Sequence, residues 1–281
     1  MSSGAIKFIK QLEEKPVLWM GILNITQDSF SDGGDFYTRD AALQRVDELI
    51  RNGADIIDIG ACSTRPGSDA PPWQDELNRL KPILEKIRPE CLDKNVLISL
   101  DSFQPRVAQS LAQDKLIDII NDVMACRHTV DLGTQKIGMF DVVKNFDLGL
   151  IIMHMQGEPK TMQLSPHYEN CVEDVKGFLQ ERLEKAIKIG IKALSIDPGI
   201  GFGKLFQHNM DLISHHGLST LKSLHYPITI GLSRKSFMNT LLNKEVHAKE
   251  RDLMTKKLEL SCIKHGARII RTHKLPQEGI V

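Results

Sequence analysis

Residues 96–121 read VLISLDSFQPRVAQSLAQDKLIDIIN, and the fold class is predicted most clearly from this stretch. Two short apolar runs, at residues 96–100 and 117–120, flank a predicted helix at residues 104–113. Two parallel strands need a long crossover between them, and the crossover is usually a helix. The stretch therefore predicts one strand–helix–strand unit of a parallel α/β sheet.

The same alternation continues along the whole chain. Gly53, Gly190 and Gly266 stand one or two residues after the ends of predicted helices, as expected for residues that end a helix in the left-handed conformation. Helices are expected at residues 40–51, 73–88, 104–113, 170–189, 209–223 and 249–264. Eight apolar runs are expected to be strands, at residues 17–23, 55–59, 96–100, 117–120, 148–153, 193–196, 227–231 and 267–270.

Eight such units predict parallel strands that are buried on both faces. The simplest sheet of this size is the closed, eight-stranded (β/α)₈ or TIM barrel, with an open doubly wound sheet as the alternative. We expect a single domain over residues 1–281, with residues 1–16 as an N-terminal extension, because no linker or low-complexity tract interrupts the pattern. Only eight residues follow His273, so the last helix is expected to be short or absent.

The composition narrows the classes of function. The chain has 36 Lys and Arg against 36 Asp and Glu, which gives no overall field for nucleic acid. Its five cysteines are widely spaced and never form a CxxC pair, which disfavours a disulfide framework or a zinc site. No apolar run approaches the roughly 20 residues of a membrane helix, and the N-terminus lacks a signal-peptide core. We expect a cytoplasmic protein that binds small molecules.

Polar residues follow almost every predicted strand. In a (β/α)₈ barrel these positions point toward the mouth of the active site. Asp and Asn are also common in turns, so a single case would mean little. Eight cases in succession favour a shared site, made by Asn24, Asp58, Asp101, Asn121, His154, Asp197, residues 233–236 and residues 271–273.

This polar set contains two kinds of chemistry. Asp101, Asn121 and Asp197 offer hydrogen-bond acceptors, and Asn121 also offers donors, which suits a flat heterocycle with adjacent N–H groups. The cationic residues suit a phosphate or a carboxylate. These residues are Arg65, Lys235, Arg271 and His273. The inferred ligand has a hydrogen-bonding ring and an anionic tail.

Two further segments lie at strand ends. Residues 199–204, GIGFGK, match neither the Rossmann pattern nor a P-loop, because Leu205 stands where a P-loop has Ser or Thr. We interpret them as a mobile loop whose backbone approaches the ring at Asp197, with a plain turn as the alternative. Ser236 precedes an apolar helical run at residues 237–242, and we expect it to cap a helix whose N–H groups bind a carboxylate.

The motifs at these positions resemble those of the dihydropteroate synthase family of pterin-binding TIM barrels. They run in the family's order from residue 20 to residue 273. The matching segments are MGILNIT at residues 20–26, DSFSDGG at 28–34, DIG at 58–60, STRPG at 63–67, IND at 120–122, MHMQGEP at 153–159, IDPG at 196–199 and GLSRKS at 231–236, with Arg271 and His273.

The resemblance implies Mg²⁺-dependent transfer of a 7,8-dihydropterin-6-ylmethyl group from its diphosphate to 4-aminobenzoate in folate biosynthesis. It also implies a homodimer and a target of sulfonamides. The implied pterin residues are Asp58, Asp101, Asn121, Asp197 and Lys235, and the implied diphosphate residues are Asn24, Arg65, Arg271 and His273. Asn24 would also hold the metal. The implied 4-aminobenzoate residues are Phe30, Thr64, Pro66, Phe202 and Ser236, with Phe30 and Asp32 on a mobile loop. Lys235, Arg271, His273 and Asp101 are the implied catalytic residues.

The sequence departs from the family pattern in a few places. Ala61 and Cys62 stand where the family has Gly-Glu, Gln27 replaces a proline, and Lys274 replaces an acid. These departures leave open a pterin-binding paralogue with weak catalysis. A methyltransferase acting on methyltetrahydrofolate has a similar barrel, but it has no diphosphate to bind, so the cationic residues count against it.

Overall fold

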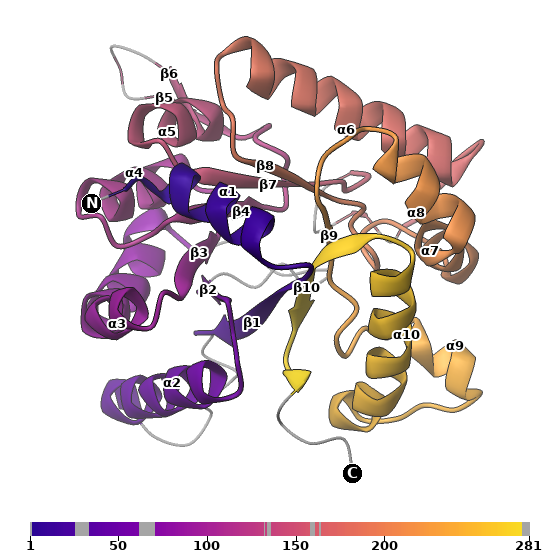
Figure 1. Ribbon diagram of the computed structural model, residues 1–281, viewed down its shortest axis with the longest axis horizontal. Coiled ribbons are helices and arrows are strands. Elements are labelled where there is room, and N and C mark those ends of the chain that lie inside the picture. Colours follow the sequence, from indigo (N-terminus) through magenta and orange to yellow (C-terminus); the bar gives the residue numbers. More distant parts are fainter. Residues whose placement is uncertain are drawn as a thin grey trace.

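Eight parallel strands close into a barrel in the order β1-β10-β9-β8-β7-β4-β3-β2 (Figure 1). The computed structural model describes residues 2–25, 34–61, 71–131, 133, 136–157, 161–162 and 164–276. The predicted TIM barrel is confirmed, and the open sheet is wrong. The strands are β1 (Leu18–Asn24), β2 (Ile56–Gly60), β3 (Leu97–Asp101), β4 (Ile119–Asp122), β7 (Gly149–Met153), β8 (Leu194–Asp197), β9 (Ile228–Ile230) and β10 (Ala267–Thr272).

All eight predicted strands are present, and most extend further toward the C-terminus than predicted. The apolar pattern stops at the first polar residue, whereas the backbone ladder includes it. Asp101, for example, aligns with Asn121 across β3 and β4. The polar strand-end residues are therefore part of the barrel wall, which fixes their backbone positions.

The helices cover the outside of the barrel (Figure 1). The predicted helix at residues 209–223 is two helices, because the Ser214 hydroxyl accepts the Gly217 N–H at 3.0 Å and starts a second helix. The helices around the barrel are α2 (Gly34–Arg51), α3 (Trp73–Asp93), α4 (Pro105–Gln113), α5 (Met139–Phe146), α6 (Cys171–Lys188), α7 (Phe206–Ile213), α8 (His215–Lys222), α9 (Met238–Leu242) and α10 (Asp252–Lys264), with the 3₁₀ helix η2 (Ala248–Arg251) before α10.

Besides an N-terminal helix, two features of the described chain were not predicted. One is a short antiparallel hairpin of β5 (Thr129–Asp131) and β6 (Lys136–Gly138), whose strands are three residues long and largely exposed. The other is α5. Strands this short carry no readable period, so their absence from the sequence prediction has a simple cause. The predicted left-handed glycines are confirmed, with positive φ at Gly53, Gly190 and Gly266.

An N-terminal helix, α1 (Gly4–Glu14), closes the bottom of the barrel. Phe8 is fully buried there among the first residues of the strands, including Met20 and Ile119. Lys7 donates to buried Asp118 at 2.8 Å, which ties the helix to the strand region. Residues 1–16 therefore include part of the barrel's base, and the C-terminal ends of the strands remain for a site.

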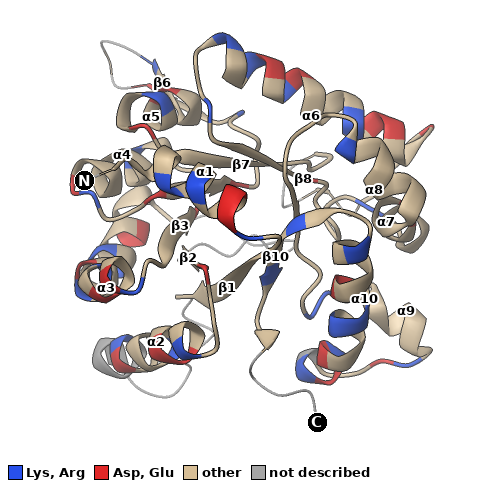
Figure 2. Ribbon diagram, in the orientation of Figure 1, with Lys and Arg blue, Asp and Glu red and all other residues tan. Residues whose placement is uncertain are grey.

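Charges of both signs are mixed along the outer helices α3 and α6 (Figure 2). Lys185 and Glu181, for example, pair across one turn of α6. Among the described helices, none combines the length and apolar character needed to cross a lipid bilayer. No α-helix follows β10 up to residue 276, where the described chain ends.

Candidate active site

An arginine lies between a buried acid, Asp58, and a partly buried one, Asp101, at the C-terminal end of the barrel. Arg271 of β10 donates from Nε to Asp58 Oδ2 at 2.6 Å and from Nη2 to Asp101 Oδ2 at 2.5 Å. Asn121 Nδ2 donates to the same Asp58 oxygen at 3.2 Å. Adjacent strands β2, β3 and β4 carry the acids and the amide, so the strand register brings these groups together. We call these four residues the arginine side of the rim.

Three acceptor atoms on this side are buried without a hydrogen-bond partner in the described part of the chain. They are Asp58 Oδ1, Asp101 Oδ1 and Asn121 Oδ1. A buried polar atom without a partner costs about 1–3 kcal/mol, so such a cluster is unusual unless a ligand supplies donors. Burial raises the pKa of Asp101, Arg271 opposes this shift, and the negative charge of Asp58 adds to it. The arrangement suits a ring with adjacent N–H groups.

A glycine-rich loop forms the opposite side of the rim. Asp197, at the end of β8, accepts the Gly199 N–H at 2.7 Å through Oδ1. Gly199 has a φ of 68°, and a Cβ there would lie 1.8 Å from the His154 carbonyl oxygen, so only glycine fits. Burial raises the pKa of Asp197, and the charge of Lys235 opposes the shift. Residues 199–204 lie beside Asp197 as expected, while their mobility and the approach of their backbone to a bound ring stay predictions.

Side chains that the sequence analysis missed hold this loop. Lys204 Nζ donates to the Phe202 carbonyl at 2.9 Å and lies 2.9 Å from His154 Nδ1. Burial lowers the pKa of Lys204 to about 7 and that of His154 to about 2, so the His154 ring is neutral and Nδ1 can accept. Tyr168 donates to the Gly203 carbonyl at 2.7 Å. Asn209 Oδ1 accepts the Gly201 N–H at 2.6 Å.

His154 directly follows β7, as predicted, and its Nδ1 lies 2.9 Å from Lys204 Nζ, so that it supports the loop. In the sequence, Lys204 is notable only as the lysine of a P-loop-like pattern that does not match. Sequence spacing gave no other signal that it would be buried under the loop.

Lys235 connects the loop to the arginine side. Its Nζ donates to the Ile200 carbonyl and lies 4.7 Å from the centroid of the Phe202 ring. Burial lowers its pKa to about 8, and the charge of Asp197 opposes this shift. We call Asp197, residues 199–204 and Lys235 the loop side of the rim.

The two sides meet at Gly231, at the end of β9. A Cβ on Gly231 would lie 3.8 Å from the Arg271 side chain and 3.9 Å from Lys235 Nζ. The expected convergence of Asn121, Asp197, Lys235 and Arg271 on one rim is thus confirmed. Within this rim Arg271 lies between Asp58 and Asp101, and the charge of Lys235 acts on Asp197. Buried charges need partners of opposite sign, which mixes the two sets.

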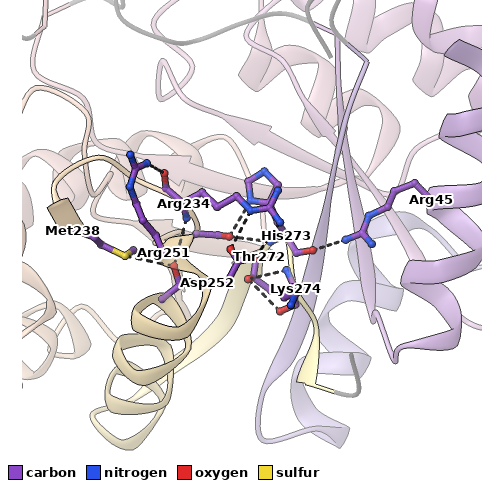
Figure 3. A network of polar contacts seen from close by, with 10 residues as sticks. Arg45, Arg234, Met238, Arg251, Asp252, Thr272, His273 and Lys274 are labelled. Carbon is purple, nitrogen blue, oxygen red and sulfur yellow. Dashed lines mark hydrogen bonds and ion pairs between the residues drawn. The ribbon is translucent and has the colours of Figure 1, made fainter. Parts of the chain in front are cut away.

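The remaining predicted residues have varied surroundings. His273 contacts Ser233, whose Oγ accepts the His273 backbone N–H at 3.1 Å (Figure 3). Asn24 is exposed at the end of β1, and Ser236 is exposed after β9. Phe30, Asp32, Thr64, Arg65 and Pro66, with the variant positions Gln27 and Cys62, lie outside the described residues.

The prediction that Ser236 caps a helix is wrong. The helix α9 starts at Met238, has five residues and has no side-chain cap. The N–H groups of Met238 and Asn239 donate to the carbonyls of Lys235 and Ser236, so successive turns already satisfy them. An apolar run with a preceding serine does not reveal this, because the turns depend on the backbone of the preceding residues.

Comparison with known proteins agrees with this geometry. The sequence pattern of the family described as "Pterin binding enzyme" matches residues 20–273. The dihydropteroate synthase of Haemophilus influenzae is 40% identical over 256 residues, which cover 90% of this chain and 87% of that protein. The chain belongs to the dihydropteroate synthase family of pterin-binding enzymes.

Solved structures of this family share the fold. The Yersinia pestis dihydropteroate synthase with a sulfonamide drug complex superposes with a TM-score of 0.81 at 36% identity, covering 93% of this chain and 90% of that one. The Xanthomonas albilineans enzyme in complex with 7,8-dihydropteroate gives a TM-score of 0.78 at 33% identity, covering 93% and 89%. The described barrel is therefore the barrel of this family.

Proposed function

We propose that this chain transfers a 7,8-dihydropterin-6-ylmethyl group from its diphosphate to 4-aminobenzoate and releases pyrophosphate. The observation that carries the proposal is the convergence of the arginine side and the loop side on one rim. The relatives named above also support the proposal, since the Xanthomonas albilineans enzyme was solved in complex with 7,8-dihydropteroate. This reaction places the chain in folate biosynthesis, as a transferase.

The pterin ring would lie between the two sides of the rim. The partnerless oxygens of Asp101 and Asn121 would accept its N–H groups on one side, and Asp197 and Lys235 would bind its opposite edge. Asp58 would contribute mainly by holding Arg271 and Asn121 in place. Carboxylates are good partners for adjacent N–H donors, and burial strengthens these bonds.

The diphosphate would lie beside Arg271 and His273, with Arg65 from the segment outside the described residues. Negative charge grows on the diphosphate as the carbon–oxygen bond breaks, and fixed cations and N–H donors stabilise it where it develops. Arg271 keeps N–H groups beyond the two that bind the acids, because a guanidinium has five. It can therefore contact the leaving group without losing its partners.

A magnesium ion fits this site as a companion of the substrate. The described residues contain no group of three His, Cys, Asp or Glu side chains that could hold a metal ion. Mg²⁺ prefers oxygen ligands and is commonly bound through one or two protein groups with substrate phosphates and water. The exposed amide oxygen of Asn24 would be the protein ligand. The ion would neutralise charge on the diphosphate.

The second substrate would enter beside Phe202 and Ser236. The Phe202 ring is held over Lys235, and the exposed Ser236 hydroxyl is available to the carboxylate of 4-aminobenzoate. Thr64 and Pro66 would complete this pocket, and the loop with Phe30 and Asp32 would close over it. An arylamine is neutral at physiological pH, so it needs orientation more than a general base.

We expect bond breaking to run ahead of attack. The pterin can delocalise positive charge at its exocyclic methylene, and the nearby carboxylates favour that charge. The carbon–oxygen electron pair leaves with the diphosphate, the amine nitrogen forms the new carbon–nitrogen bond, and one amine proton is lost. Diphosphate binding would come first, because it completes the aminobenzoate pocket.

The direct test is pyrophosphate release from purified protein mixed with Mg²⁺, the pterin diphosphate and 4-aminobenzoate. Release that requires all three supports the proposal. Pterin binding without turnover would identify a weak paralogue, and methyl transfer from methyltetrahydrofolate without aminobenzoate dependence would identify a methyltransferase. Either result would refute the assigned reaction.

We also propose a homodimer in the cytoplasm. Leu253 and Leu260 on α10 are more than half exposed, at 56% and 53%, which supports an apolar contact between subunits. Sedimentation at micromolar protein concentration tests this point, and a sharp monomer at all concentrations would contradict it.

A further inference from the structure

His273 is held through both its backbone and its ring by one serine. Ser233 follows β9 and is 8% exposed. Its Oγ accepts the His273 backbone N–H at 3.1 Å and lies 2.9 Å from His273 Nδ1. Two contacts to the same residue fix both the position of the histidine and the rotation of its ring.

The hydroxyl of Ser233 has one proton to donate. In the part of the chain that the structure describes, its only hydrogen-bond partner besides the His273 N–H is His273 Nδ1. A buried hydroxyl that accepted from a protonated Nδ1 would leave its own proton without an acceptor, and such a loss is costly. The favoured arrangement therefore has the serine donating to an unprotonated Nδ1, which leaves the ring proton on Nε2.

A network from two sides of the barrel fixes Ser233 in this position (Figure 3). Arg234 has a left-handed backbone with a φ of 61°, which is unfavourable unless the surroundings hold it. Its side chain forms a two-point ion pair with Asp252 of α10, at 3.0 and 3.2 Å. Arg251 donates to the Arg234 carbonyl at 2.7 Å. The turn that carries Ser233 is therefore fixed from α10 and from the 3₁₀ helix η2 before it.

The other side of the network holds the histidine itself. Arg45 of α2 donates to the His273 carbonyl oxygen, as Figure 3 shows. Residues from α2 and α10 thus bracket the end of β10, where the polypeptide leaves the barrel. The contacts of Arg45 and Arg251 go to backbone carbonyls, of His273 and Arg234 respectively, so the network fixes the chain around the histidine.

We propose that Ser233 is a positioning residue that holds neutral His273 as the Nε2–H tautomer, so that Nε2 donates a hydrogen bond to an anionic group of the substrate. This proposal rests on the proposed function, in which His273 lies at the diphosphate. The opposite tautomer would point a lone pair at a phosphate oxygen and weaken binding. The serine hydroxyl thus decides whether the histidine attracts or repels the leaving group.

The tautomer can be measured without any substrate. Nitrogen-15 NMR of histidine-labelled protein distinguishes protonated from unprotonated ring nitrogens, and His273→Gln identifies the relevant signals among the ten histidines. In the neutral ring we expect Nε2 protonated and Nδ1 unprotonated. A protonated Nδ1 in the unmodified protein would overturn the proposal, and this measurement needs no Ser233 variant to fold.

A double-mutant cycle tests the consequence for the reaction. Ser233→Ala should lower kcat/KM for the pterin diphosphate by about 2- to 10-fold, the scale of one hydrogen bond, and leave the KM for 4-aminobenzoate unchanged. In a His273→Gln background the same change should have no further effect, because the serine acts through the histidine. An equal loss in both backgrounds would overturn the proposal.

The control removes a hydroxyl far from the rim. Ser223→Ala, at the end of α8, loses a bond to the Thr220 carbonyl and should not change kcat/KM. If His273→Gln alone leaves kcat/KM unchanged, the placement of His273 at the diphosphate fails, while the NMR result still decides the tautomer. Failure of the proposed place of His273 at the diphosphate and failure of the tautomer proposal therefore give different results.

Discussion

The arginine side and the loop side of the rim hold their polar groups in different ways. On the arginine side, Asp58, Asp101 and Asn121 stand on adjacent strands and Arg271 links the acids. On the loop side, backbone groups do most of the holding, since Asp197 binds a backbone N–H and Lys235 binds a backbone carbonyl. The barrel strands therefore position the polar groups of the arginine side, and a loop positions those of the loop side.

This difference affects how each side responds to change. Charges on the arginine side are already paired, so removal of the cation leaves buried acids without compensation. The loop side depends on Lys204, the buried last residue of the loop, whose Nζ donates to the Phe202 carbonyl. We therefore expect large effects of substitution on the arginine side and graded effects on the loop side.

The largest expected effect is that of Arg271→Ala. It removes a proposed contact to the leaving group, so kcat/KM should fall by about 10²-fold or more. It also leaves Asp58 and Asp101 unpaired, and breaking a buried pair costs about 3 kcal/mol or more of unfolding free energy. Steady-state kinetics and thermal unfolding measure the two losses.

The control for this prediction lies on the same strand. Arg268 is at the opposite end of β10, where it donates to the Leu12 and Lys15 carbonyls beside α1. Arg268→Ala should lower stability and leave kcat/KM close to the unmodified value. An equal loss of kcat/KM in Arg268→Ala and Arg271→Ala would contradict a specific role of Arg271 in the reaction.

Asp197→Asn tests the loop side with a smaller change. The amide can still accept the Gly199 N–H, so the loop should keep its conformation, but the charge that faces the ring is lost. A charge-assisted hydrogen bond contributes about 1.5–3 kcal/mol, so pterin affinity should weaken by about 10- to 100-fold. Calorimetry with a pterin lacking the diphosphate measures this directly. Unchanged affinity would exclude Asp197 as a ring contact, and Asp211→Asn on α7 is the matched control.

Lys204→Met should act through the loop. It removes the donor to the Phe202 carbonyl and the partner of His154 Nδ1, so we expect a 2- to 10-fold rise in KM for 4-aminobenzoate, about one hydrogen bond in scale. A fall in kcat with no change in either KM would indicate that the loop does not position Phe202.

The same variant changes the pH dependence of stability. The folded-state pKa of Lys204 is about 7, below its ordinary value of 10.5, because burial disfavours the charged form. The unfolded chain therefore binds more protons between these values, and the free energy of unfolding gains a rising component from about pH 7 to 10.5. Denaturant unfolding at several pH values should show a smaller rise for Lys204→Met than for the unmodified protein. Parallel curves for both proteins would contradict the burial of this lysine.

The smallest expected effect is a difference in unfolding free energy between two glycine-to-alanine variants. Gly203→Ala puts a side chain at a φ of 60° and 2.8 Å from the Gln156 carbonyl, whereas Gly190→Ala meets a similar φ of 92° with no atom within 4 Å. Both should lose about 1 kcal/mol of unfolding free energy for the backbone conformation, and Gly203→Ala should lose more. Equal melting temperatures would show that the loop can move away from Gln156.

The arginine side was largely predictable from the sequence, because a polar residue after an apolar run marks a strand end. That rule found Asp58, Asp101 and Asn121 on this side and Asp197 on the other, and the order of the strands follows from the parallel fold. It could not show that Arg271 pairs with two acids, since pairing depends on strands that meet only when the barrel closes. The roles proposed for these residues stay predictions.

The loop side was less predictable. Lys204, Tyr168 and Asn209 hold the loop from three separate segments, and nothing in their spacing relates them. The cap expected at Ser236 is absent because local turns use the N–H groups first. The helix α1 and its closure of the barrel base were also missed, since residues 1–16 were predicted only as an extension and contacts with the strands are not visible in the sequence.

The central claim is that both sides of the rim bind one pterin ring. A crystal structure of the protein with a bound pterin tests it most directly. We expect the ring between the two sides, with its N–H groups on Asp101, Asn121 and Asp197 and with Lys235 at its edge. A ring bound elsewhere, or in contact with only one side, would contradict the account.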